Sequence, residues 1–377
     1  MLTNVLLALV LSAAIALATG PKLIEWLRGH QMKTSENELG PKEHLKKRGT
    51  PIMGGLMIAL GCIVSFVLCA AYTGAWVTTI LPLLLVSLGS MAVGLADDWT
   101  KAVKHRSEGL TPWQKIIGLS VVCLGFSVWC YFTQGSKVLL PFANTEWDLG
   151  LWYIPLLALT VLFMTNSANL QDGIDGILSS VTSVGCMGWA VIAGLSAVTV
   201  YQHLNGGSFG IPMVKIPDDP DAARALQDNY SAIAIFAAAL CGGCLGFLRY
   251  NRYPAKVFMG DTGSLTIGGI IAVLAIIVHK ELLIPILCGI FLVESLSVIL
   301  QVEFFKFGKR RGVRQRIFKR TPIHDNFRVL PSQLDPDCRY LLRNWPHGAW
   351  HESKITVRFW ITTIILAAAT IITLKIR

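Results

Sequence analysis

The stretch that decides the fold is ILPLLLVSLGSMAVGLADDWTK (residues 80–101). Residues 80–96 carry no charge, and about 20 helical residues suffice to cross a hydrocarbon core. The run ends in two adjacent aspartates, Asp97 and Asp98, and Lys101 follows them. Carboxylates are unfavourable at the negative C-terminal end of a helix dipole, so a merely solvated helix end would favour lysine. The sequence therefore predicts a membrane-spanning helix that ends in functional carboxylates.

Apolar runs of this kind recur along all 377 residues. Hydrophobic residues make up 53% of the chain and charged residues 15%, and the mean hydropathy is +0.55; about a quarter of the residues in a soluble domain are charged. We predict an all-α integral membrane protein, a polytopic bundle of about ten transmembrane helices that forms one catalytic domain over residues 1–377. The expected helices lie near 2–19, 52–71, 80–96, 116–133, 150–166, 177–200, 231–248, 263–279, 282–302 and 356–374.

The distribution of cations predicts the orientation, because Lys and Arg are retained on the cytoplasmic side. Five alternate loops between the expected helices, which are listed at the end of this paragraph, hold 27 of the 33 Lys and Arg residues when the last loop is counted to residue 358. We therefore expect both termini in the periplasm and an active site built from cytoplasmic loops. The net charge of +10 reflects this topology and does not indicate nucleic acid. The expected cytoplasmic loops are 20–50, 97–115, 166–175, 249–262 and 303–355.

The unusual polar motifs all fall on this predicted cytoplasmic face. Besides the Asp-Asp pair they are NSANLQDGIDG (166–176), NRYPAKVFMGDTGS (251–264) and TPIHDNF (321–327). Carboxylates brought together repel one another unless a cation lies between them. A set of oxygen ligands without cysteine suits Mg²⁺ or Mn²⁺ better than zinc. The sequence predicts a divalent-metal site formed by Asp97, Asp98, Asp172, Asp175 and Asp261.

Cations and glycines accompany these acids. Glycines such as Gly260 let backbone N–H groups approach an anion closely. Metal-binding carboxylates, lysines and glycine-rich turns together favour a phosphate ester or diphosphate substrate. We expect the protein to bind this substrate at the bilayer surface. The accompanying lysines are Lys46, Lys47, Lys101, Lys104, Lys115 and Lys256.

Structural alternatives exist for several of these residues. Asp261 or Thr262 is also a good N-cap for the helix that follows. The DGIDG segment also suits a plain turn, and His324 also suits a solvated loop. Glu294 is expected in the middle of the 282–302 helix, where an ionisable group usually finds a partner inside the bundle; a structural hydrogen bond is the favoured interpretation.

Five motifs in this order resemble the phospho-N-acetylmuramoyl-pentapeptide-transferase family, over nearly the whole chain. They are KRGTPIMGG (47–55), DDWTK (97–101), NSANLQDGIDGI (166–177), NRYPAKVFMGDTGS (251–264) and VESLSVILQV (293–302). The resemblance implies transfer of phospho-N-acetylmuramoyl-pentapeptide from UDP-MurNAc-pentapeptide to undecaprenyl phosphate, with Mg²⁺. The products are lipid I and UMP, and the location is the bacterial inner membrane.

The resemblance also implies roles for individual residues. Asp97 and Asp98 match the catalytic pair, with His324 as a further catalytic residue, and Asp261 matches the metal ligand. Phe258 is expected to stack on uracil, and Gly260 lies in the substrate-binding turn. Lys101, Lys104 and Lys115 are expected near the phosphates. The nucleotide pocket is expected to include Lys47, Asn169, Asp172, Asp175 and Asn251.

Two departures from the family pattern leave alternatives open. Where the family usually has three consecutive histidines, this chain has His324, Asp325 and Asn326. The loop 328–354 is also longer than expected. A related enzyme that transfers N-acetylglucosamine-1-phosphate to a polyprenyl phosphate is the nearest rival. A secondary transporter is a remote one, because transporter sites lie near the bilayer midplane, where only Glu294 is expected. A homodimer is compatible with the sequence.

Overall fold

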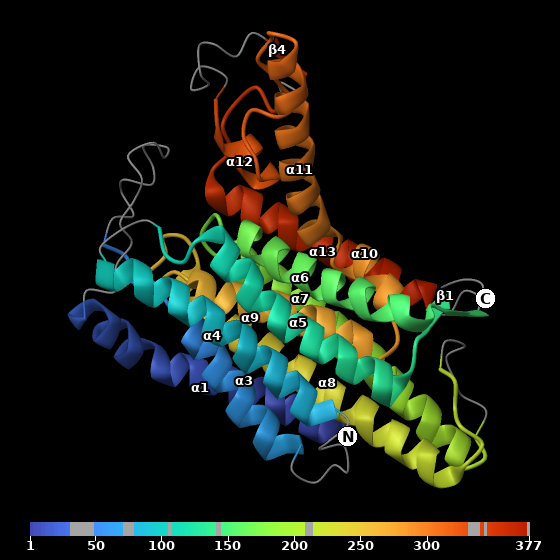
Figure 1. Cartoon of the computed structure of the whole chain (residues 1–377). Coiled ribbons are helices and arrows are strands. Elements are labelled where there is room, and N and C mark those ends of the chain that lie inside the picture. The colour runs from blue at the N-terminus through green and yellow to red at the C-terminus, as the bar shows by residue number, and fades with distance from the viewer. Residues whose placement is uncertain are drawn as a thin grey trace.

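The computed structural model describes residues 1–30, 49–70, 79–104, 108–140, 145–207, 214–330, 340–342 and 345–374. Within these residues the chain forms a helical bundle with two small two-stranded sheets. Long helices run side by side, and one helical segment projects from the side of the bundle (Figure 1). The prediction of an all-α polytopic membrane protein is confirmed.

Eight helices of the described chain are long and apolar enough to cross a membrane. A ninth helix, α3 (Gly55–Ala70), is apolar but has only 16 residues. These helices match the expected spans in order, with boundaries that shift by several residues. The eight long helices are α1 (Leu2–Gly29), α4 (Leu81–Lys104), α5 (Pro112–Gln134), α6 (Tyr153–Gln171, preceded by the 3-10 turn η2, Gly150–Trp152), α7 (Ile177–Leu204), α8 (Pro220–Asn251), α9 (Gly260–Ile277) and α13 (Glu352–Thr373).

The helix expected near 282–302 is broken in the structure. The segment before Cys288 meets the segment after it at an angle of 80°. Pro285 lies in the first turn of the short helix before the bend, and Gly289 begins the helix after it; proline and glycine are common causes of helix kinks. The elements here are η3 (Glu281–Leu283), α10 (Ile284–Leu287) and α11 (Gly289–Arg310).

Helix α11 leaves the bundle as the projecting orange segment in Figure 1. Beside it lie α12 (Ile323–Arg328) and a small parallel sheet of β3 (Gln315–Arg316) and β4 (Tyr340–Leu341). Glu294 lies in the second turn of α11, shortly after the bend. The sequence placed Glu294 in the middle of the 282–302 helix, whereas in the structure it lies near the start of α11.

The most enclosed helices are α8 and α9. Helix α8 packs against α1 and α7, and α9 packs against α4 and α6. Residues 231–246 of α8 read SAIAIFAAALCGGCLG, and small residues of this kind let neighbouring helices approach closely. Helices α1 and α13 are much more exposed, which suits helices that face lipid.

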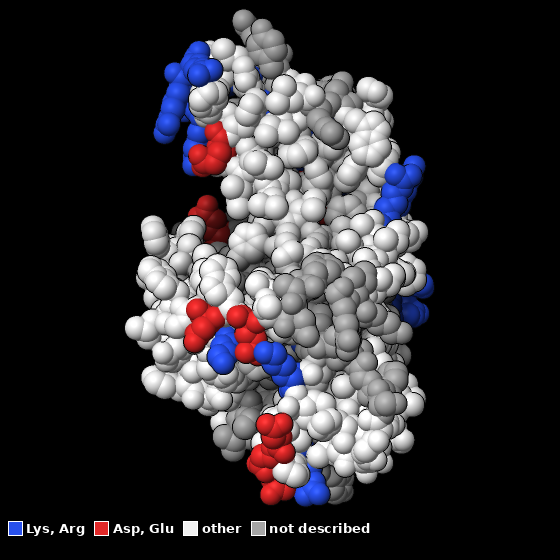
Figure 2. All heavy atoms as spheres, turned by 90° about the vertical axis from the view of Figure 1, so that its right-hand side faces the viewer, with Lys and Arg blue, Asp and Glu red and all other residues white. Residues whose placement is uncertain are grey.

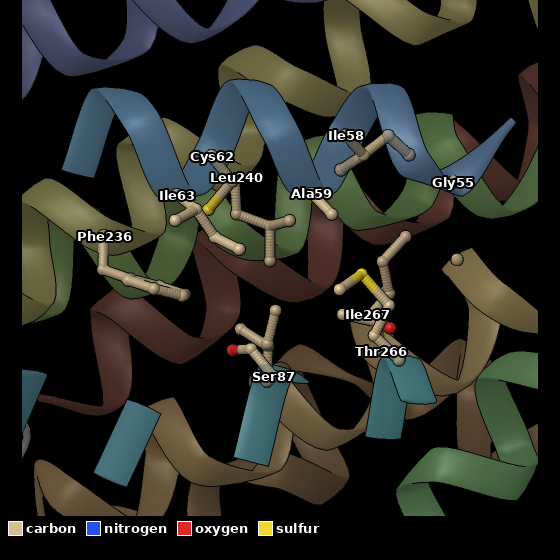
Figure 3. Close-up of a pocket in the computed structure, with 13 residues that line it drawn as sticks. Gly55, Ile58, Ala59, Cys62, Ile63, Ser87, Phe236, Leu240, Thr266 and Ile267 are labelled. Carbon is tan, nitrogen blue, oxygen red and sulfur yellow. The ribbon is translucent and has the colours of Figure 1, made fainter. Parts of the chain in front are cut away.

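A small apolar cavity lies between α3, α4, α8 and α9 (Figure 3). Ile58, Cys62, Phe236 and Ile267 are among its lining residues. Its volume is about 10 Å³, which is at the lower limit for one water molecule. It is therefore a packing gap between helices and offers no room for a substrate.

Helix α1 begins, and α13 ends, at one end of the bundle, opposite the C-terminal end of α4 (Figure 1). The antiparallel hairpin of β1 (Lys137–Leu140) and β2 (Thr145–Asp148) is at this same end. Viewed onto this end, the surface is mostly uncharged, with scattered charges of both signs (Figure 2). The start of α1 and the end of α13 thus share one side of the bundle; that both termini are periplasmic remains a prediction from the cation distribution.

Candidate active site

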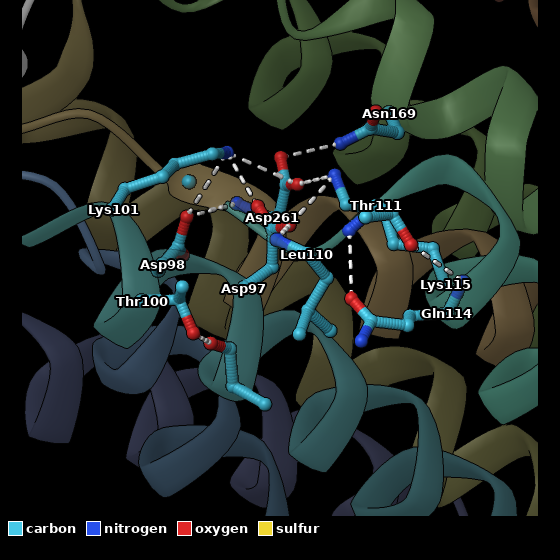
Figure 4. Close-up of polar contacts among 12 residues, drawn as sticks. Asp97, Asp98, Thr100, Lys101, Leu110, Thr111, Gln114, Lys115, Asn169 and Asp261 are labelled. Atoms are coloured by element: carbon cyan, nitrogen blue, oxygen red, sulfur yellow. Dashed lines mark hydrogen bonds and ion pairs between the residues drawn. The ribbon is translucent and has the colours of Figure 1, made fainter. Parts of the chain in front are cut away.

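Three predicted carboxylates meet where the end of α4 lies beside the start of α9 (Figure 4). One oxygen from each of Asp97, Asp98 and Asp261 lies within 4.8 Å of the others. Asp97 and Asp98 are almost completely buried, at 0% and 1% exposure. Residues more than 160 positions apart therefore form one acidic cluster, as the sequence suggested.

Two lysines neutralise much of this acidic cluster. The Lys101 ammonium lies 2.6 Å from the Asp97 carboxylate and 3.2 Å from that of Asp261. From α5, the Lys115 ammonium lies 3.1 Å from Asp97 and also contacts Asp261. Two cations between three carboxylates lower the repulsion that would otherwise separate the acids. Lys104 is the exposed last residue of α4.

The two adjacent aspartates contact different parts of the chain. Asp97 accepts a hydrogen bond of 2.8 Å from the backbone N–H of Leu110, just before α5. Asp98 accepts hydrogen bonds from the backbone N–H groups of Asp261 and Thr262, at 3.1 and 2.9 Å. The Thr262 hydroxyl donates a further hydrogen bond of 2.7 Å to Asp98. The N-cap residue of α9 is Met259, which provides no side-chain cap, so the cap comes from Asp98 and not from Asp261 or Thr262.

A third helix, α6, orients Asp261. The side-chain amide of Asn169 donates to the Asp261 carboxylate at 2.8 Å and to the Ser264 hydroxyl at 2.9 Å. Helix α6 continues to Gln171, with Asp172 as its C-cap, and this extra helical turn brings Asn169 to α9. The sequence placed Asn169 in the site but did not identify Ser264, whose only signal was its place in the GDTGS motif.

Asp172 and Asp175 are not part of the three-carboxylate cluster in the described chain, so the prediction that five acids share one metal site is wrong. Asp175 is buried and accepts a 2.9 Å hydrogen bond from the backbone N–H of Ala255. Asn251 is also buried; its side chain bonds to the backbone of Gly176 and Val257. These contacts join the two polar loops to each other, and the nucleotide-binding roles of these residues stay predictions.

The Pro51 to Gly55 segment pairs with the loop before α9. Phe258 donates its backbone N–H to Pro51 and accepts from Gly54, both at 2.8 Å. The Phe258 side chain is half-buried, and its stacking on uracil stays a prediction. Gly260, with φ +73°, lies where an added Cβ would collide with an Asp98 oxygen. Lys47 lies outside the described residues.

His324 is buried, at 1% exposure, so the alternative of a solvated loop histidine is wrong. Its Nδ1 lies 3.0 Å from Oε1 of Glu294, which confirms the expected structural partner for that carboxylate. Its Nε2 lies against Gly173, where an added Cβ would collide with it. His324 therefore supports the turn after α6, and its ring nitrogens face the carboxylates of Glu294 and Asp325.

The residues that replace two family histidines also point inward. Asp325 pairs with Arg320 at 3.2 Å and with Arg328. Asn326 accepts from the backbone N–H of Lys319 and donates to the carbonyl of Trp345, both at 3.0 Å. The HDN sequence therefore stabilises the fold around α12.

Comparison with known proteins agrees with this geometry. A protein of Phocaeicola vulgatus named phospho-N-acetylmuramoyl-pentapeptide-transferase is 38% identical over 99% of this chain and 94% of its own length. The chain belongs to the phospho-N-acetylmuramoyl-pentapeptide-transferase family. Proteins of the same name from Bacteroides thetaiotaomicron and Desulfitobacterium hafniense are 37% and 34% identical, over 99% and 96% of this chain.

The protein-family model described as glycosyl transferase family 4 matches residues 80–279 of the sequence. This range contains Asp97, Asp98 and Asp261, together with both lysines of the cluster and Asn169. It does not contain His324 or the HDN sequence. The acidic cluster of this phospho-N-acetylmuramoyl-pentapeptide-transferase family member thus lies within the range matched by glycosyl transferase family 4, and α12 lies outside that range.

Proposed function

We propose that this chain transfers phospho-N-acetylmuramoyl-pentapeptide from UDP-MurNAc-pentapeptide to undecaprenyl phosphate. The products are lipid I and UMP, in the membrane step of peptidoglycan synthesis. The observation that supports this best is the cluster of Asp97, Asp98 and Asp261 with two lysines, at one end of a transmembrane bundle, in a chain of this family. We place this end of the bundle at the cytoplasmic face of the inner membrane.

In this reaction an oxygen of the lipid phosphate attacks the phosphorus that carries the sugar. The bond from that phosphorus to the bridging oxygen of UMP breaks, and UMP leaves with the electron pair. Phosphoryl transfer depends chiefly on alignment and on neutralising charge. Lys101 and Lys115, which are held by Asp97 and Asp261, are suited to contact the phosphate oxygens. Asn169 orients the Asp261 carboxylate.

The reaction has little need of a general base to deprotonate the acceptor phosphate. A phosphate monoester has its second pKa near 6, so roughly nine-tenths of the acceptor is already dianionic at pH 7. A buried carboxylate such as Asp97 is therefore needed mainly to orient the lysines, and to accept a proton only when the acceptor binds as the monoanion.

The acidic cluster fits a magnesium ion, because its oxygens are the ligands that Mg²⁺ prefers and it contains neither cysteine nor histidine. We propose Asp261 as the metal ligand, with Asp97 beside it. When bound, Mg²⁺ would neutralise diphosphate oxygens and stabilise the leaving UMP.

The test is UMP release by the purified full-length protein in detergent, with undecaprenyl phosphate as acceptor. We expect release from UDP-MurNAc-pentapeptide that stops when EDTA is added. Because of the HDN sequence, transfer of N-acetylglucosamine-1-phosphate to a polyprenyl phosphate is the second candidate function. UDP-N-acetylglucosamine is therefore the comparison donor. Release only from that donor would replace the proposed substrate, and release unaffected by EDTA would refute the magnesium assignment.

A further inference from the structure

The two adjacent aspartates at the end of α4 differ in what their carboxylates can still do. Both oxygens of Asp98 accept hydrogen bonds from the first turn of α9: one from Asp261, the other from the N–H and the hydroxyl of Thr262. Asp98 is 1% exposed. Asp97 is just as buried, at 0% exposure, but it pairs closely with Lys101 and Lys115, at 2.6 and 3.1 Å, besides one backbone N–H; the Lys101 ammonium is 3.7 Å from Asp98.

Helix geometry explains this difference. Consecutive residues of an α-helix point about 100° apart, because one turn takes 3.6 residues. When Asp97 points toward Leu110 and Lys115, Asp98 must therefore point toward a different neighbour, and that neighbour is α9 (Figure 4).

The contact between Asp98 and α9 is electrostatically favourable. The first N–H groups of a helix have no partner within the helix, and the helix dipole favours a negative charge beside them. Asp98 supplies this charge from another helix. The close approach depends on Gly94, one turn earlier on α4, where an added Cβ would lie 2.5 Å from the backbone carbon of Asp261.

We propose that Asp98 is a positioning residue, which caps α9 and thereby fixes the direction of Asp261, and that Asp97 is the member of the pair that holds the two lysines. This inference rests on the proposed function, because that function makes Asp261 part of the active site. The two aspartates therefore have different roles although they are the same residue type: Asp98 acts through the backbone of α9, and Asp97 acts through Lys101 and Lys115.

The first test measures melting temperature in detergent without substrate. Asp98→Asn and Thr262→Val each remove part of the same contact, so we expect each to lower the melting temperature and the double variant to lose clearly less than the sum. Thr165→Val is the matched control, because its buried hydroxyl bonds to the carbonyl of Val161 in its own helix. Its effect should add to that of Asp98→Asn. Additive losses for Asp98→Asn with Thr262→Val would overturn the cap.

Thr262→Ser provides a second test if Asp98→Asn does not fold. Thr262→Ser keeps the hydroxyl that donates to Asp98, so we expect it to melt above Thr262→Val. Equal melting of these two variants would contradict the importance of the hydroxyl–carboxylate contact.

The second test is the pH profile of UMP release. For a positioning residue, we expect Asp98→Asn to lower kcat/KM by about tenfold or more, and by the same factor from about pH 6 to about pH 9, across and above the second pKa of the acceptor phosphate. A loss that shrinks at alkaline pH would instead make Asp98 a base and overturn the proposal. If the wild-type protein releases no UMP from either donor, the proposed function fails, and the melting test still decides the cap.

Discussion

The buried pair of Glu294 and His324 provides a prediction that needs no substrate. The two side chains are 0% and 1% exposed, and His324 Nδ1 lies 3.0 Å from the Glu294 carboxylate. Asp325 lies 3.6 Å from the other ring nitrogen, and Arg328 is also near. Replacing Glu294 with glutamine keeps the size of the side chain and one acceptor oxygen, but removes the negative charge.

The sign of the pH effect follows from the pKa of His324. Burial by itself would lower this pKa, but the carboxylates of Glu294 and Asp325 raise it, and the net result is a pKa above the ordinary value of 6.5. The pair therefore stabilises the fold fully below the unfolded-state pKa, and this stabilisation is lost as the pH rises through the folded-state pKa. Removing one partner of a buried ion pair costs about 3–5 kcal/mol. Because glutamine retains a hydrogen-bond acceptor, we expect a loss of about 3 kcal/mol at acidic pH.

The assay is thermal unfolding in detergent between about pH 5 and about pH 9, a range that spans the titration of histidine. Glu294→Gln should unfold at a much lower temperature than wild type at acidic pH, and this difference should narrow as the pH rises. Glu303→Gln is the matched control, because Glu303 lies on the same helix in an exposed pair with Lys306; it should change little. A difference between Glu294→Gln and wild type that is the same at every pH would refute the reasoning.

Three further predictions concern the acidic cluster. Asp261→Asn should raise the Mg²⁺ concentration needed for half-maximal UMP release; an unchanged requirement would show that Asp261 is not a ligand. Asp97→Asn should lower kcat/KM strongly, and a loss that disappears at alkaline pH would indicate a base, whereas a constant loss would indicate positioning. Gly94→Ala should lower both activity and melting temperature, because its Cβ would lie 2.7 Å from the backbone nitrogen of Thr262. Gly125→Ala, with open space around it, is the control, and equal effects of the two would contradict the close-packing argument.

Several features of the site could be predicted because their signal is local in the chain. The uncharged run of 80–96 and the aspartates that end it are adjacent, so the end of a transmembrane helix was evident without a structure. The GDTGS motif combines glycines with a carboxylate, which identified Asp261 as a site residue, and the family resemblance placed Asn169 in the site. The bend before α11 was missed, although Pro285 and Gly289 were visible, because a proline near the start of a helix is also compatible with a straight one.

The sequence by itself determined the membrane class, the order of the helices and the set of polar loops, because hydrophobic length and composition are properties of contiguous residues. Only the tertiary structure decided which carboxylates meet. It joined Asp97, Asp98 and Asp261, left Asp172 and Asp175 out, and buried His324 beside Glu294. The physical reason is that the rotation and packing of each helix depend on contacts with residues far away in the chain, and a rotation of about 100° between neighbours is enough to give two adjacent aspartates different partners.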